Sequence, residues 1–282
     1  MTDTPTELPG TSPLGGRVLV RRHSLLVRIT HWINVLCILV LIMSGAQIFN
    51  AHSELYIGQK ANFDDPVFSM SAKNTPTGPV GETQILGAHF NTTGFLGLST
   101  TNGVYESRGF PWWFTIPSYR DLATGRRWHF FFAWVFAING LIYLIASILS
   151  RHISRDLIPT GAELRGIGTS IWDHMRLRFD HTRRYNVLQQ LAYLSVIFLA
   201  LPLIVLAGMT MSPGLDTAFP WLVDVFQGRQ TARTIHFIVA TAIVLFVIVH
   251  VVMVLISGVW NNIRSMITGN YAVSAKGDDH VS

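Results

Sequence analysis

The sequence contains a single cysteine and few charged residues. Its only cysteine is Cys37, so the 282-residue chain can form no internal disulfide and no site built from several thiolates. Charged residues make up only 13% of the chain and hydrophobic residues 49%, and the mean hydropathy is +0.37. This balance is too apolar for an ordinary soluble domain of that length. It predicts an integral membrane protein.

Four segments lack any Asp, Glu, Lys or Arg and are long enough to cross a bilayer, because about 20 apolar residues span its hydrocarbon. Within them the sequence predicts four membrane-spanning helices at Ile29–Phe49, Trp128–Leu149, Val187–Met211 and Ile235–Val259. Pro202 predicts a kink in the third. The expected fold class is all-α, a four-helix transmembrane bundle with a long outer loop, residues 50–127, between the first two helices.

Arginines flank the predicted spans unevenly. Four precede the first span and seven lie between the second and third, whereas the outer loop carries six basic against six acidic residues. Cytoplasmic loops are rich in Lys and Arg, so both termini are expected in the cytoplasm of a bacterial inner membrane and the outer loop outside. The polar segment 1–16 predicts a disordered tail and no signal peptide, followed by a membrane domain at 17–267 and a cytoplasmic tail at 268–282.

The sequence pI of about 9.7 does not indicate nucleic-acid binding. The excess basic residues lie in the segments that flank the spans, where membrane topology already explains them. Membrane lipid is the partner that these residues predict, and nucleic acid is not.

Histidines inside the spans are the features that most need an explanation. An imidazole in hydrocarbon loses its hydration and needs a partner, so it indicates a functional site. His236 and His250 lie fourteen residues apart in one helix, an advance of about 21 Å that returns to within roughly 40° of the same face. With the predicted helix directions, His129 shares the outer depth with His236, and His31 shares the inner depth with His250.

Two neutral imidazoles that face each other across an apolar bundle suit a planar metal macrocycle ligated from both sides. The two depth-matched pairs therefore predict two b-type haems. Gly45 and Gly140 offer positions without a side chain at about the depth of the other haem on their helices, although close helix packing is the alternative explanation. Three arginines each precede a histidine by three residues and suit haem propionates, although ordinary boundary charge also explains them: Arg28, Arg126 and Arg233.

With these histidines in place, the sequence between Val18 and Ile267 resembles the four-helix di-haem cytochrome b subunits of membrane-bound hydrogenases and formate dehydrogenases. The resemblance rests on RxxHW at Arg28–Trp32, on GRRWHFFFAW at the start of the second span, and on the two histidines of the fourth. It is greatest for the thiosulfate-reductase-like cytochrome b branch. The resemblance implies that four histidines ligate two haems b: His31, His129, His236 and His250.

The function that the resemblance implies is electron transfer between a periplasmic oxidoreductase partner, of the molybdenum-cofactor type, and the quinone pool. The chain would then be an electron-transfer subunit whose partner holds the catalytic site, and no catalytic residue is predicted in it. Three other hypotheses stay open: a stand-alone cytochrome acting on a small molecule such as superoxide, a histidine-lined transporter of divalent metal, and a structural anchor for a peripheral enzyme.

The outer loop is the largest predicted extracytoplasmic segment, and its end concentrates aromatic residues in FPWWFTIP, from Phe110 to Pro117. Such a cluster is typical of a membrane-interface belt and also of a surface that seats a protein partner. The loop leads directly into the helix whose first turn carries His129. We therefore expect the redox partner to dock on the outer loop through Trp112 and Trp113.

Overall fold

The computed structural model describes residues 17–151, 158–168, 170 and 187–274 of the chain. The chain divides into two compact units: a terminal unit of Met1–His31 with Val249–Ser282, and a main unit of Trp32–Ile248. The expected disordered tail 1–16 and most of the arginine-rich segment between the second and third spans lie outside the described residues.

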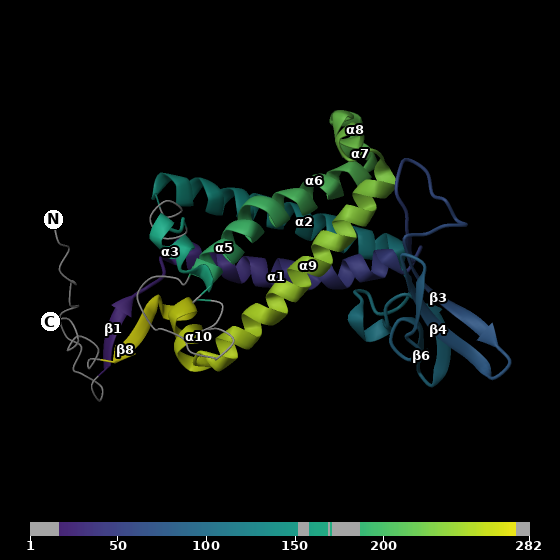
Figure 1. The fold of residues 1–282 in the computed structure, drawn as a ribbon, viewed down its shortest axis with the longest axis horizontal. Coiled ribbons are helices and arrows are strands. Elements are labelled where there is room, and N and C mark those ends of the chain that lie inside the picture. The colour runs from purple at the N-terminus through teal and green to yellow at the C-terminus, as the bar shows by residue number, and fades with distance from the viewer. Residues whose placement is uncertain (1–16, 152–157, 169, 171–186, 275–282) are drawn as a thin grey trace. The chain divides into compact units, whose positions relative to one another are not determined.

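Four long apolar helical segments occupy the positions that the sequence predicts for membrane spans (Figure 1). The helix α1 begins four residues before the first predicted span, and α2 begins six residues before the second. At the start of α2, the Asp121 carboxylate accepts the Thr124 N–H at 2.9 Å and caps the helix. The segments are α1 Leu25–Phe49, α2 Leu122–Leu149, the third span Val187–Met211, and α9 Arg229–Ile256.

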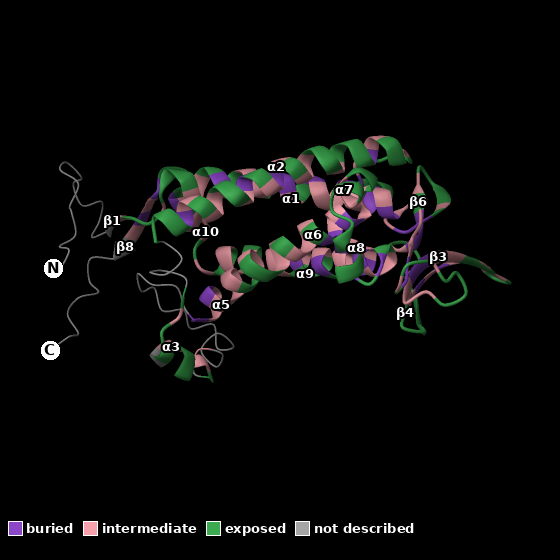
Figure 2. Ribbon diagram, turned by 90° about the horizontal axis from the view of Figure 1, so that it is seen from above, coloured by how far each residue is buried: buried purple, intermediate pink, exposed green. Residues whose placement is uncertain are grey.

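The spans expose most of their apolar surface. Of the most apolar window in each, only 6% to 17% of the residues are buried within the protein. Figure 2 shows exposed and intermediate residues along the long helices α1, α2, α6 and α9. Apolar surface left uncovered over a span's length suits hydrocarbon, so the chain is a multi-pass membrane protein.

The third span is interrupted where the sequence predicts a kink. It consists of α5 Val187–Ser195, a π-helical turn at Val196–Ala200, and α6 Leu201–Met211. Pro202 is the second residue of α6, after the π turn, and a proline, which lacks an N–H, disturbs the regular hydrogen-bond ladder of the preceding turn. The interruption therefore has a local cause in the sequence.

The fourth span ends three residues earlier than predicted. The helix α9 stops at Ile256, and Gly258 adopts a φ of 103°, a left-handed conformation that favours glycine. A separate helix, α10, then runs over Val259–Thr268. The break at Gly258 was not foreseen, because the apolar composition continues through it.

The all-α expectation is wrong for the outer loop, which folds into a small β module. A four-stranded antiparallel sheet has the order β2-β3-β4-β5, and a second sheet pairs β6 with β7. Short α7 and α8, Pro213–Ala218 and Trp221–Val225, connect the third and fourth spans. The strands are β2 Glu54–Leu55, β3 Phe68–Thr75, β4 Gly78–Ile85, β5 Ala88–Asn91, β6 Gly97–Thr101 and β7 Val104–Arg108.

Tight turns and one close approach explain how so short a segment forms two sheets. The β6–β7 turn is Asn102-Gly103, with φ of 51° and 79°, the left-handed pair that a two-residue hairpin requires. A Cβ added at Gly97 would lie 2.4 Å from the Ser71 carbonyl oxygen, so only glycine allows β6 to approach β3. We refer below to the segment from β2 through the 3₁₀ turn Trp112–Phe114 as the outer module.

The terminal unit joins both ends of the described chain. Strand β1 Arg17–Arg21 pairs antiparallel with β8 Asn270–Ser274, so a strand forms within the segment expected to be a tail. The Asn261 side chain of α10 exchanges two hydrogen bonds of 2.9 Å with the Ala272 backbone. The unit thereby closes on itself around the ends of α1 and α9.

A buried arginine fastens the outer module to the helices. The Arg108 side chain is 1% exposed. It donates to Gln47 of α1 at 3.4 Å and, in the approach to α2, to Thr115 at 3.0 Å and to the Ser118 carbonyl at 3.2 Å. A buried guanidinium with this many acceptors is costly to disturb, because its partners would be left unpaired.

We predict that Arg108→Ala loosens the outer module. Removing one partner of a buried charged network costs about 3 to 5 kcal/mol. Limited proteolysis of the purified chain should then cleave within residues 50–127 far faster than in the unmodified protein. Arg108 also pairs with the Glu106 carboxylate at 3.3 Å, and the matched control is Arg120→Ala, because Arg120 pairs with the same carboxylate at 3.0 Å but is 53% exposed, and exposed pairs contribute little. Equal protease resistance in the two variants would contradict this role of Arg108.

Candidate functional site

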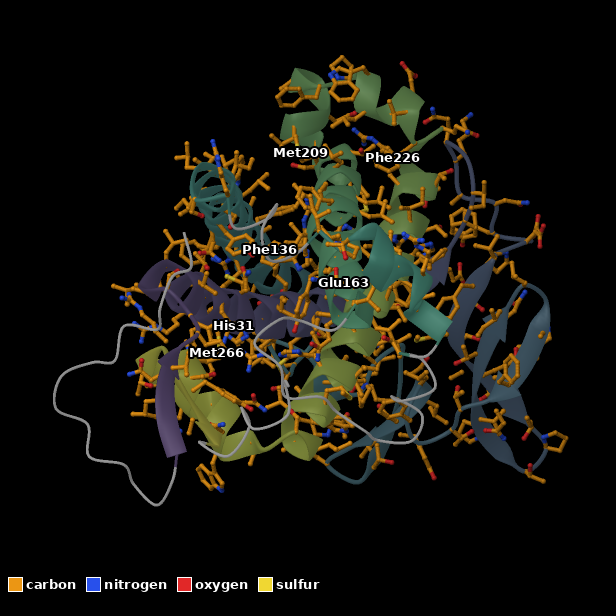
Figure 3. All side chains as sticks on the ribbon, turned by 60° about the vertical axis from the view of Figure 1, so that its left-hand side comes forward. His31, Phe136, Glu163, Met209, Phe226 and Met266 are labelled. Atoms are coloured by element: carbon orange, nitrogen blue, oxygen red, sulfur yellow. The ribbon has the colours of Figure 1, made fainter. Side chains whose placement is uncertain are left out.

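The structure brings the four span histidines together as two pairs. In the main unit, His129 of α2 and His236 of α9 have ring centroids 6.2 Å apart and ring planes at 62°. In the terminal unit, His31 of α1, labelled in Figure 3, and His250 of α9 have centroids 6.4 Å apart and planes at 59°. These are the pairs that helix direction and rise predict from the sequence.

The distances within the pairs fit one metal ion between two imidazoles. Two ring nitrogens bonded to the same metal at about 2 Å each leave the ring centroids about 6 Å apart. Among the described residues, no group of three or more His, Cys, Asp or Glu side chains could hold a metal ion. Two imidazoles from the protein, with other ligands from a bound group, is the ligand set that the iron of a bis-histidine haem uses.

Each ring of the main-unit pair has a second polar contact that orients it. The His129 Nδ1 lies 3.1 Å from the Ser44 hydroxyl of α1, and the His236 Nδ1 lies 2.9 Å from the Ile204 carbonyl oxygen of α6. These contacts leave Nε2 of both rings as the nitrogen available to a metal. The residues Ser44 and Ile204 were not predicted from the sequence, because their contacts depend on how the helices pack.

Glycines adjoin the two rings of the same pair. A Cβ at Gly45 would lie 3.4 Å from His129 Cε1, and one at Gly208 would lie 3.3 Å from His236 Cε1. Gly45 was predicted from the sequence, but Gly208 was not. Gly208 lies on α6, a helix that carries no ligand histidine from which a spacing could be counted. A Cβ at Gly140 would meet no atom of the described residues within 4 Å.

The three predicted propionate partners all contact protein groups. Arg28 donates to the Ile267 carbonyl, and its buried Nε has no hydrogen-bond partner among the described residues. The Arg126 guanidinium lies 5.6 Å from the Phe130 ring centroid. Arg233 donates to the His52 carbonyl and lies 5.7 Å from the Phe49 ring centroid. Propionate binding by these arginines remains a prediction.

The outer module covers the first turn of α9, which lies a few residues before His236 in the chain. The Gly58 carbonyl accepts the N–H groups of Gln230 and Thr231 at 3.1 and 3.4 Å, and Thr234 donates to the Tyr56 carbonyl at 2.6 Å. Burial raises the pKa of Tyr56, as does its hydrogen bond to the Glu54 carboxylate. The module thus caps the N–H groups at the start of the helix that carries His236.

Two further groups of apolar side chains matter near this end of the main unit. Met209 and Phe226, both labelled in Figure 3, belong to a small apolar cluster between α6 and α8. On the outer module, Trp112 and Trp113 are 41% and 54% exposed, and the Trp113 ring packs on Phe95, itself 49% exposed, at 5.8 Å. Both predicted docking residues are therefore accessible, and the Trp113 ring packs against its neighbours.

Comparison with known proteins identifies relatives of the chain. A family model described as prokaryotic cytochrome b561 matches residues 22–269. A protein of Azospira oryzae described as putative protein-methionine-sulfoxide reductase subunit YedZ1 is 29% identical over 234 residues, which cover 82% of this chain and 89% of the relative. No solved structure matches the chain.

The family match includes all four long helices and both histidine pairs. It agrees with the resemblance seen in the sequence, and the chain therefore belongs to the prokaryotic cytochrome b561 family of membrane haem b proteins.

Proposed function

We propose that this protein carries electrons across the membrane through two b haems, one held by His31 and His250 and the other by His129 and His236. The observation that carries the proposal is the pair of ring-centroid distances, 6.4 and 6.2 Å, each about that of two imidazoles on one metal ion. A haem b, when bound, supplies a one-electron ferric/ferrous couple.

The chain's own residues hold and insulate the two sites. The four imidazoles would hold the two haems, and the contacts of His129 and His236 with neighbouring helices fix their rings. The apolar spans exclude water and protons from the path between the pairs. His236 and His250 lie fourteen residues apart in α9, a rise of about 21 Å. One ligand is therefore near each end of the part of the helix that spans the hydrocarbon.

The other predicted site residues have supporting roles in this proposal. Gly45 and Gly140 leave room beside a macrocycle, and three arginines meet propionates near the water: Arg28, Arg126 and Arg233. The unpartnered Arg28 Nε supports the first of these contacts. The arginines that surround the first span favour cytoplasmic termini, and thus an outer site at His129 and His236 in a bacterial inner membrane.

The proposed partners are a periplasmic oxidoreductase of the molybdenum-cofactor type, on the outer module, and the quinone pool. The relative from Azospira oryzae is described as a subunit of a protein-methionine-sulfoxide reductase, which supports a role beside a catalytic chain. Under this proposal, the non-quinone substrate reacts on that partner. The direction of electron flow follows from the partner's potential.

We predict two low-spin haems b per chain, because two ligand pairs leave no histidine of the four unused. A pyridine haemochrome assay on the purified chain, scaled to protein concentration, should give a ratio of two. A ratio of one or zero would overturn the proposal of two sites.

We predict that substitution of each ligand removes one haem and not the other. His129→Ala and His236→Ala should abolish the same redox component, and His31→Ala and His250→Ala the other, since each pair shares one metal. The measurement is a potentiometric titration followed by absorbance, with His89→Ala as a control in the exposed strand β5. If the His31 and His236 substitutions abolished the same redox component, the pairing would be wrong.

We predict that Trp112 and Trp113 help to dock the partner. Replacing both with alanine removes rigid, exposed anchors of the kind that dominate interfaces, so reduction or oxidation by the partner should slow while both haems stay bound and dithionite-reducible. The control is Trp221→Ala, a 55% exposed tryptophan in α8, between the third and fourth spans. Unchanged partner-dependent rates in the double variant would place the docking surface elsewhere.

A further inference from the structure

The rings of His129 and His236 are held by neighbouring helices in matching ways. Helix α1 gives His129 one oxygen at Nδ1, from Ser44, and one residue without a side chain at Cε1, Gly45. Helix α6 gives His236 an oxygen at Nδ1, from Ile204, and Gly208 at Cε1. Each ring thus fits a slot made of an acceptor oxygen and a glycine of one adjacent helix.

The direction of the hydrogen bonds follows from the chemistry of the two oxygens. A carbonyl oxygen only accepts, so His236 carries its proton on Nδ1. The Ser44 hydroxyl donates to the Val40 carbonyl of its own helix at 2.7 Å, which leaves its oxygen lone pairs to accept from His129 Nδ1. With the proton on Nδ1, the neutral form of each imidazole has its Nε2 lone pair free for a metal.

The two slots differ in one respect that the sequence controls. The acceptor for His236 is a backbone carbonyl, which any residue at that position would supply. His129 has a hydrogen bond to the Leu41 backbone carbonyl and, in addition, a 3.1 Å contact between its Nδ1 and the hydroxyl of Ser44, a side chain with 0% exposure. Alanine at position 44 would remove the hydroxyl contact and leave the His129 imidazole with the Leu41 carbonyl as its hydrogen-bond partner on α1.

We propose that Ser44 is a positioning residue that fixes the tautomer and ring orientation of His129 and lowers the reduction potential of the haem that His129 ligates. The inference rests on the proposed function. A hydrogen bond from the distal ring nitrogen makes a ligating imidazole a stronger electron donor, which stabilises the ferric over the ferrous state. Gly45 complements it by admitting the ring edge beside the hydroxyl.

The test is a potentiometric titration of the intact protein in detergent, followed by absorbance. Ser44→Ala should shift the ferric/ferrous equilibrium of one haem, the one that His129→Ala removes, about tenfold toward ferrous, which is about 59 mV for a one-electron couple. The potential of the second haem should not change. Ser44→Thr keeps the hydroxyl and should keep the original potential.

The matched control is Thr210→Val on α6. Thr210 is also fully buried, and its hydroxyl bonds to the Leu206 carbonyl of its own helix at 3.0 Å, so losing it should leave both potentials unchanged. If Ser44→Ala destabilises the haem until it is lost, retention of that haem in Ser44→Thr supports the same role. A Ser44→Thr variant that behaves like Ser44→Ala overturns it.

The outcomes separate this inference from the proposed function. Unchanged potentials in Ser44→Ala, with two haems bound, overturn the role of Ser44 alone. A His129→Ala variant that still holds as much haem as the unmodified protein overturns the ligand assignment, and the inference about Ser44 falls with it.

Discussion

Hydrocarbon offers no hydrogen-bonding partner, and this constraint governs the structure of the spans. The backbone satisfies it by forming helices, and hydroxyl groups satisfy it by bonding to a carbonyl of their own helix, as Thr210 does. Asn139 bonds across to Asn34 of α1 at 2.8 Å. His129 and His236 each place one ring nitrogen in a hydrogen bond with a neighbouring helix. The second nitrogen of each ring also needs a partner, and a bound metal would be that partner.

The same constraint made much of the site predictable from the sequence. A span must be long and free of charge, so four helices could be located by composition alone, and a fixed rise per residue gave each histidine a depth. The second and fourth spans run in the same direction, which matched His129 with His236 near the start of each. The first span runs in the opposite direction, which matched His31 with His250, and the structure has both pairs. Helix ends were less predictable, because capping by Asp121 and the break at Gly258 depend on single residues rather than on composition.

The parts that sequence reasoning missed are those set by tertiary contacts or by short signals. Asn102-Gly103, between two segments of strand-forming residues, is a strong hairpin signal, and attention to it would have indicated sheet in the outer loop. Ser44 and Gly208 carry no such signal. Their importance arises from which helix faces they share with a histidine ring, and one sequence does not specify interhelical rotation.

The size of the outer module asks for a functional explanation. Two neighbouring antiparallel helices need only a few connecting residues, so the bundle itself does not require a folded β module. The module is fixed to both helices that carry the His129–His236 pair. Gly58 caps the start of α9, and Arg108 binds the segment that leads into α2. Its surface is therefore held at a constant distance from His129 and His236. Under the proposed function, electron exchange with a partner docked on this module would benefit from a constant distance, which a flexible loop of the same length would not provide.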